Sequence, residues 1–152
     1  MLYAVEQDAS KKRPDLNNLN TAALAYIGDA VYELAVRERI LSSGTVRADR
    51  LHKTATAYVC APGQARVIHA IFGDLTEEEQ RRVKRYRNFR NHSRAKNTDV
   101  MTYSWATAFE ALAGYLYLAG DSERLEWLLD RAFAVIEGKR EKSHVIRKEE
   151  TE

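Results

Sequence analysis

The sequence predicts an all-α protein. Apolar residues recur at helical spacing along most of the chain, and no stretch alternates apolar and polar residues as a half-buried strand does. The 152 residues include only 2 Pro and 7 Gly, so few points interrupt the helical pattern. Apolar residues make up 45% of the chain, which is enough for a core of ordinary size. We therefore expect one helical domain over residues 18–138, between a polar leader (1–17) and a charged tail (139–152).

Capping signals predict three helices in the first half of the domain. The first is expected from about Asn20, which is a favourable N-cap residue, to Ser42, and Gly44 ends it. Thr45 is expected to cap a second helix that extends to about residue 61. Pro62 begins a third, because proline is favoured in the first turn of a helix. This third helix is expected to end near residue 72.

Similar signals predict three helices in the second half. Thr76 and Glu79 form a capping-box pattern at the start of a fourth helix that extends to about residue 88. Asn and Ser residues then favour a loop. The last two helices are bounded by Tyr103 and Gly120 for the fifth, and by Ser122 and Gly138 for the sixth. The fifth is apolar almost all round, so we expect it at the centre of the fold.

Two lone carboxylates interrupt the most apolar helices. Asp29 lies within the first and Glu110 within the fifth, each among small residues that let helices approach closely. An ionised carboxylate is costly to bury unless it is paired or bound to a metal. Either acid alone is equally well explained by a structural ion pair or hydrogen bond. The two together favour a divalent metal site, since Mg²⁺ typically takes one or two carboxylates together with waters and phosphate oxygens.

Two further acids lie near this pair in the sequence. Glu33 is one helical turn after Asp29, where it could orient the site from outside the ligands. An ion pair with Arg37, again four residues on, is the preferred interpretation of Glu33. Asp99 could add a carboxylate, but a role at the start of the fifth helix is preferred.

Residues 81–96 form a cationic segment. They carry eight of the 24 Lys and Arg residues and no acid, while all 22 Asp and Glu residues lie elsewhere. Aromatic and Asn side chains interleave the cations, a mixture typical of phosphate-contacting surfaces. A merely solvated face is the alternative, and we favour nucleic-acid binding. The candidate RNA-contacting residues are Arg82, Lys84, Arg85, Arg87, Arg90, Arg94, Lys96 and Asn97.

Composition also excludes several classes of protein. Cys60 is the only cysteine, so no intrachain disulfide can form, and a reducing cytoplasm is expected. We find no secretory signal and no apolar stretch long enough to span a bilayer, so no membrane partner is expected. The four histidines show no metal-ligand spacing, and the chain lacks a glycine-rich phosphate loop.

Two segments resemble the motifs of the ribonuclease III family. Leu24-Ala25-Tyr26-Ile27-Gly28-Asp29-Ala30-Val31 is similar to its signature, Leu-Glu-Phe-Leu-Gly-Asp-(Ala or Ser). Thr107-Ala108-Phe109-Glu110-Ala111-Leu112-Ala113-Gly114 is similar to the second motif, Asp-x-x-Glu-Ala-Leu-x-Gly. Ala22, Ala25 and Thr107 stand where the family carries acids, and there is no room for its double-stranded-RNA-binding domain. Both departures resemble the Mini-ribonuclease III subfamily.

This resemblance implies a homodimeric, ribonuclease III-like helical bundle that cleaves both strands of double-stranded RNA and leaves a 5′-phosphate. Asp29 and Glu110 carry over as catalytic ligands of Mg²⁺, with Mn²⁺ as a substitute. Thr107, like Glu33 and Asp99, is a candidate to support these ligands from outside. The subfamily matures the precursor of the large-subunit (23S) ribosomal RNA with help from a ribosomal protein. The alternatives are a catalytically silent RNA-binding or ribosome-associated module on the same fold, and a small helical interaction protein with structural acids.

Overall fold

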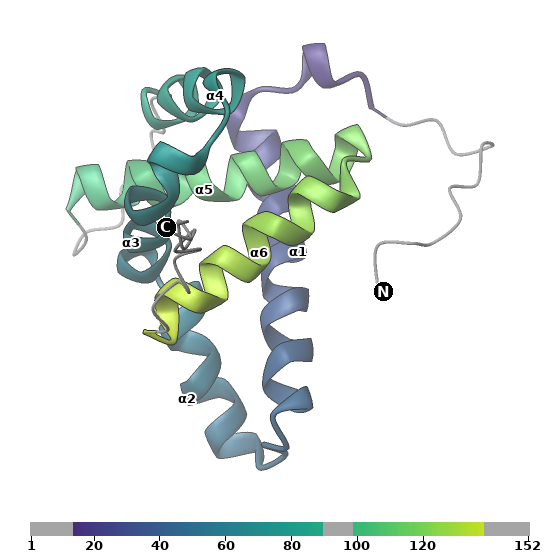
Figure 1. The fold of residues 1–152 in the computed structure, drawn as a ribbon, viewed down its shortest axis with the longest axis vertical. Coiled ribbons are helices and arrows are strands. Elements are labelled where there is room, and N and C mark those ends of the chain that lie inside the picture. Colours follow the sequence, from purple (N-terminus) through teal and green to yellow (C-terminus); the bar gives the residue numbers. More distant parts are fainter. Residues whose placement is uncertain (1–13, 90–98, 139–152) are drawn as a thin grey trace, which may run out of the picture.

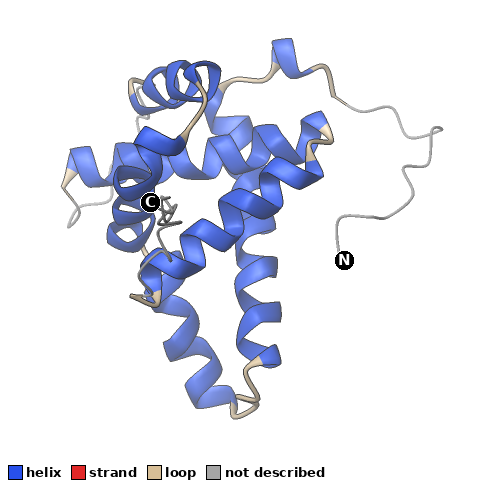
Figure 2. Cartoon of the chain, in the orientation of Figure 1, coloured by secondary structure: helices blue, strands red, loops and turns tan. Residues whose placement is uncertain are grey.

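The computed structural model describes residues 14–89 and 99–138, and these form helices and turns without any strand (Figure 2). The predicted all-α fold is therefore confirmed. The helices are η1 (Leu16–Asn18), α1 (Thr21–Ser42), α2 (Ala48–Val59), α3 (Ala61–Ile71), η2 (Phe72–Asp74), α4 (Glu77–Arg87), α5 (Val100–Ala119) and α6 (Ser122–Ile136). The predicted leader falls largely outside the described residues, and the predicted tail falls wholly outside them.

Two central helices, α1 and α5, organise the fold. They cross each other, and α3, α4 and α6 surround the crossing while α2 returns alongside α1 (Figure 1). Residues that face inward from both central helices form the core, including Tyr32 and Phe109, whose rings meet edge to face at 4.9 Å. Helix α5 contributes buried residues along most of its length, as its uniformly apolar sequence predicted.

The backbones of α1 and α5 touch where they cross. A Cβ atom at Gly28 would lie 1.7 Å from the backbone oxygen of Glu110. A Cβ atom at Gly114 would lie 2.0 Å from the backbone oxygen of Leu24. No side chain can occupy either position at this separation. The two glycines therefore set the distance between the helices that carry Asp29 and Glu110.

Several predicted helix boundaries are confirmed. The Asn20 side chain accepts a hydrogen bond from the Ala23 N–H at 2.9 Å, which caps α1. Thr76 and Glu79 form the reciprocal capping box of α4. Gly120 ends α5 with a φ of 73°, in the left-handed region that favours glycine. Asp99 is the N-cap of α5, as preferred, and this helix starts three residues earlier than Tyr103.

Two predicted caps are wrong. Helix α2 begins at Ala48 rather than directly after Thr45, and Thr45 instead lies beside Ser43, with their hydroxyl oxygens 3.5 Å apart. Ser122 is the first residue of α6 rather than its cap. Asp121 takes the capping position because its carboxylate accepts a hydrogen bond from the Arg124 N–H at 3.2 Å.

None of the helices in the described part of the chain combines the length and the apolar character that crossing a bilayer requires.

Candidate active site

The crossing of α1 and α5 brings Asp29 and Glu110 together. Asp29 lies on the exposed side of α1, and Glu110 is half-buried on α5. Burial and the nearby charge of Asp29 raise the pKa of Glu110 to about 7, although the Gln64 amide opposes this change. Burial and the charge of Glu33 also raise the pKa of Asp29. Two acids, predicted from separate segments, thus form one electrostatically coupled pair.

This pair differs from a structural buried acid in the same molecule. Burial disfavours the charged form of Glu79, but hydrogen bonds from Arg124 and Thr76 outweigh it and lower the pKa of Glu79. The Arg124 Nη2 atom lies 2.7 Å from the Glu79 carboxylate. Neither Asp29 nor Glu110 forms such an ion pair with any residue in ranges 14–89 and 99–138. The pair therefore concentrates negative charge without a cationic side chain from this part of the chain.

A divalent cation fits this donor set. Hard carboxylate oxygens are the ligands that Mg²⁺ prefers, and uncompensated charge favours a cation between them. The described residues contain no group of three or more His, Cys, Asp or Glu side chains able to hold a metal. Two protein carboxylates suffice for Mg²⁺, which commonly keeps several waters and binds substrate phosphates. Asp29 and Glu110 are therefore the residues that would hold it.

The three supporting candidates have different surroundings. Glu33 forms the preferred ion pair with Arg37, at 2.9 Å, and its charge still acts on Asp29. Thr107 is half-buried one helical turn before Glu110, on the same side of α5. The Asp99 carboxylate is used in capping, since it accepts a hydrogen bond from the Met101 N–H at 3.4 Å. A supporting role for each of them in the site stays a prediction.

One residue beside the acids was missed by the sequence analysis. Gln64 lies in α3, is 1% exposed, and contacts the Glu110 carboxylate closely enough to affect its pKa. The available signal was a polar residue at a position of α3 where its neighbours are apolar and buried, namely Ala65, Val67 and Ile68.

The cationic segment begins on α4. Arg82 is held by Glu78, at 2.9 Å, and lies 3.9 Å above the Tyr115 ring. Arg87 lies over the Trp105 ring at 4.9 Å. Lys84 and Arg85 are exposed. The other candidate RNA contacts, Arg90, Arg94, Lys96 and Asn97, lie outside the described residues.

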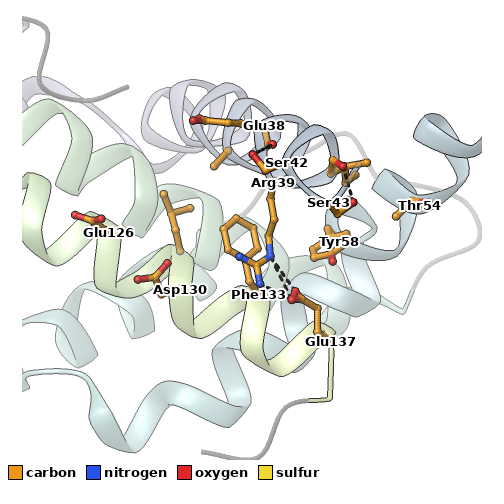
Figure 3. A pocket seen from close by; sticks show the side chains of 13 residues that line it. Glu38, Arg39, Ser42, Ser43, Thr54, Tyr58, Glu126, Asp130, Phe133 and Glu137 are labelled. Atoms are coloured by element: carbon orange, nitrogen blue, oxygen red, sulfur yellow. Dashed lines mark hydrogen bonds and ion pairs between the residues drawn. The ribbon is translucent and has the colours of Figure 1, made fainter. Parts of the chain in front are cut away.

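Two hollows lie away from the acid pair. A hollow of about 830 Å³ separates the start of α1 from α4 and includes Arg82 and Arg85 in its lining. Another, of about 610 Å³, lies between α1, α2 and α6 (Figure 3). In this second hollow Arg39 pairs with Glu137, with Nε donating to Oε2 at 2.9 Å, and covers the Phe133 ring. Neither Asp29 nor Glu110 lines either hollow. We therefore place the candidate metal site at the crossing of α1 and α5 rather than in these hollows.

Comparison with known proteins agrees with the two motifs. Residues 22–121 match the family model of the ribonuclease III domain, and this range contains both acids. The chain belongs to the ribonuclease III family of endoribonucleases. The chain is 47% identical over 124 residues to Mini-ribonuclease 3 of Brevibacillus brevis, an alignment that covers 82% of this chain and 92% of that protein. It is 50% identical over 114 residues to Mini-ribonuclease 3 of Symbiobacterium thermophilum, covering 75% and 88% of the two chains.

The fold of this ribonuclease III family member also matches a solved structure. A crystal structure of a Fusobacterium nucleatum protein superposes with a TM-score of 0.70 and 32% identity, and the match covers 83% of this chain and 98% of that one. The relatives named Mini-ribonuclease 3 confirm the sequence-based resemblance to that subfamily, and the solved structure agrees with the all-α fold.

The raised pKa of Glu110 predicts that the site destabilises the metal-free protein at alkaline pH. A carboxyl group with a folded-state pKa of about 7, against the ordinary value of 4.5, holds a proton in the folded protein that the unfolded chain releases between these values. The protonated Glu110 therefore contributes its full stabilisation of the folded protein below pH 4.5, and this stabilisation is lost as the pH rises through about 7. We expect Glu110→Gln to increase the free energy of unfolding at pH 8, by roughly 3 kcal/mol at most, with little effect at pH 4.

Urea unfolding in metal-free buffer at several pH values measures this difference. Glu123→Gln, on the exposed side of α6, is the matched control. Parallel pH profiles of the free energy of unfolding for wild type and Glu110→Gln would contradict the raised pKa of Glu110.

Proposed function

We propose that this endoribonuclease cleaves both strands of double-stranded RNA with Mg²⁺ held by Asp29 and Glu110. The observation that carries the proposal is the coupled acid pair at the α1–α5 crossing, which has no compensating cation among the described residues. A structural pair would resemble Glu79 and Arg124. The ribonuclease III domain match, which spans the pair, supports the same chemistry.

The two acids would hold and orient the reacting groups. A bound Mg²⁺ supplies positive charge that polarises the scissile phosphoryl group and promotes ionisation of the attacking water. Glu110 lies on the central helix α5, where it is half-buried. Asp29 lies on the exposed side of α1, where a duplex can reach it. Attack of water at phosphorus would leave a 5′-phosphate and a 3′-hydroxyl.

A homodimer would place one such site at each strand, because one site cannot reach both strands at once. An apolar stripe on α1 supports this assembly. Tyr26, Leu34 and Leu41 are 81%, 46% and 54% exposed, and their spacing keeps them within about 80° of one another around the helix. Exposed apolar residues gathered on one surface often mark an interface. The stripe begins three residues before Asp29, so an interface there would border both active sites.

The cationic segment would bind the phosphates of the RNA backbone. Among the described candidate RNA contacts of this segment, Lys84 and Arg85 are exposed, whereas the Arg82 guanidinium is already engaged by Glu78 and Tyr115. Lys84 and Arg85 are therefore expected to contribute most to the salt-dependent part of binding from α4.

Replacing Lys84 and Arg85 by Ala is expected to weaken duplex binding about equally for all sequences. Each phosphate contact that is lost should reduce the slope of log K against log salt by roughly 1. Filter binding or fluorescence anisotropy at several salt concentrations measures the slope. Arg50→Ala, an exposed cation on α2, controls for loss of charge alone. An unchanged slope of log K against log salt in the double variant would show that other residues contact the RNA phosphates.

In the cell, we propose that the enzyme matures the 23S ribosomal RNA precursor in the cytoplasm, with a large-subunit ribosomal protein as a partner. The high identity to proteins named Mini-ribonuclease 3 supports this placement.

Incubating the purified enzyme with a synthetic RNA duplex and with structured 23S precursor, with and without Mg²⁺, tests the proposal. We expect Mg²⁺-dependent cuts in both strands with 5′-phosphate ends. Retention of RNA without any cut in Mg²⁺ or Mn²⁺ would contradict the proposal and favour a catalytically silent binding module.

A further inference from the structure

Gln64 occupies a fixed position beside the acid pair. Helix α3 packs against α5, and Gln64 lies in its first turn. The preceding residue fixes the start of this helix, because a Cβ atom at Gly63 would lie 2.7 Å from the backbone oxygen of Ala57 in α2. The close α2–α3 junction therefore determines where the Gln64 side chain enters the space next to Glu110.

The Gln64 amide is buried and incompletely hydrogen-bonded. The residue is 1% exposed, and its Nε2 atom makes no hydrogen bond of standard geometry to any described residue. An unsatisfied buried donor destabilises the folded state, so an apolar side chain would stabilise the fold better at this position. Gln80 in α4 shows the usual arrangement, since its Nε2 atom donates to the backbone oxygen of Phe72 at 2.9 Å.

The Gln64 amide faces a charged group rather than an apolar one. Its interaction with the Glu110 carboxylate favours the charged form of that acid and opposes the effects of burial and of Asp29. The Gln64 amide is thus close enough to affect the pKa of the Glu110 carboxyl group, although its Nε2 atom does not reach standard hydrogen-bond geometry. The Gln64 N–H is therefore suited to donate a hydrogen bond to the Glu110 carboxylate when the site holds a cation.

We propose that Gln64 is a positioning residue, whose amide N–H holds one oxygen of Glu110 and leaves the other directed to the divalent ion. This role rests on the proposed function of the acid pair. Outer groups that orient metal ligands typically change metal affinity by about 10–100-fold when they are removed. Gln64 would provide a neutral, oriented contact beside the two acids.

Gln64→Met tests this role, because methionine has nearly the same shape and lacks the donor. We expect it to fold at least as stably as wild type and to bind Mn²⁺ about 10–100-fold more weakly, as measured by electron paramagnetic resonance without RNA. The Mg²⁺ concentration for half-maximal cleavage should rise in parallel, while kcat at saturating Mg²⁺ and the Kd for RNA stay near wild type. Gln80→Met is the matched control, and it should lose stability without losing Mn²⁺ affinity.

Two outcomes overturn the inference. One is wild-type Mn²⁺ affinity in folded Gln64→Met. The other is failure of both Gln64→Met and Gln64→Leu to fold, which would make Gln64 a residue of the core alone. Failure of the proposed function is seen separately, since Mn²⁺ would then bind wild type and Asp29→Asn equally.

Discussion

Asp29→Asn and Glu110→Gln are each expected to abolish cleavage of an RNA duplex while leaving RNA binding intact. Each change removes one of two negative charges available for the cation, and neither alters side-chain size appreciably. Metal assistance is worth several kilocalories per mole in the transition state, so we expect cleavage to slow by at least about 10³-fold, equivalent to roughly 4 kcal/mol. Single-turnover cleavage at saturating enzyme separates this loss from any change in binding.

Matched neutralisations distinguish this effect from a general change of charge. Asp130→Asn and Glu123→Gln alter exposed acids of α6 and should cleave at the wild-type rate. A full cleavage rate in either Asp29→Asn or Glu110→Gln would remove that residue from the metal site. Loss of RNA binding together with cleavage would instead show that the acid supports the fold or RNA binding.

Gly28→Ala is expected to destabilise the protein strongly, although it adds only one methyl group. Alanine normally stabilises a helix interior by about 1 kcal/mol relative to glycine. At Gly28, however, the new atom would lie 1.7 Å from the Glu110 backbone oxygen, so α1 and α5 must separate. Overpacking a core typically costs roughly 1–3 kcal/mol and occasionally more, and we expect about 3 kcal/mol for this variant because the obstacle is backbone. Gly114→Ala should behave similarly, since its Cβ would meet Leu24.

Gly73→Ala provides the control for this prediction. Nothing lies within 4 Å of a Cβ atom at Gly73, so this change should leave stability near wild type. Urea unfolding gives the free energies, and cleavage assays below the unfolding transition test whether the separated helices still hold the acids together. Wild-type stability and activity in Gly28→Ala would contradict the close crossing of α1 and α5.

Local signals in the sequence were sufficient for most of the fold. The apolar run of α5, the capping box at Thr76 and the left-handed Gly120 each express a preference that neighbouring residues do not override. The cap at Ser122 failed because the adjacent Asp121 accepts the hydrogen bond instead. The cap at Thr45 failed because α2 begins only at Ala48, where no side chain caps it. Residue type alone does not reveal which of two adjacent polar side chains will reach the free N–H groups of a helix.

The site was only partly predictable for a different reason. Asp29 and Glu110 stood out because charged residues are costly within apolar helices. Their mutual coupling depends on the backbone contact at Gly28 and Gly114, which joins segments that are far apart in the sequence. Gln64 carries no charge and belongs to a third helix, so nothing in its own segment links it to Glu110. The packing of α3 on α5 makes this connection.

The position of a bound divalent ion tests the joint role of the two acids most directly. Crystals grown with Mn²⁺ allow the ion to be located by its anomalous scattering at the manganese absorption edge. We predict a peak between the carboxylates of Asp29 and Glu110, with both within about 2.0–2.3 Å of the ion, and its loss in Asp29→Asn. A peak that touches neither carboxylate, in crystals of enzyme that cleaves RNA with Mn²⁺, would contradict it.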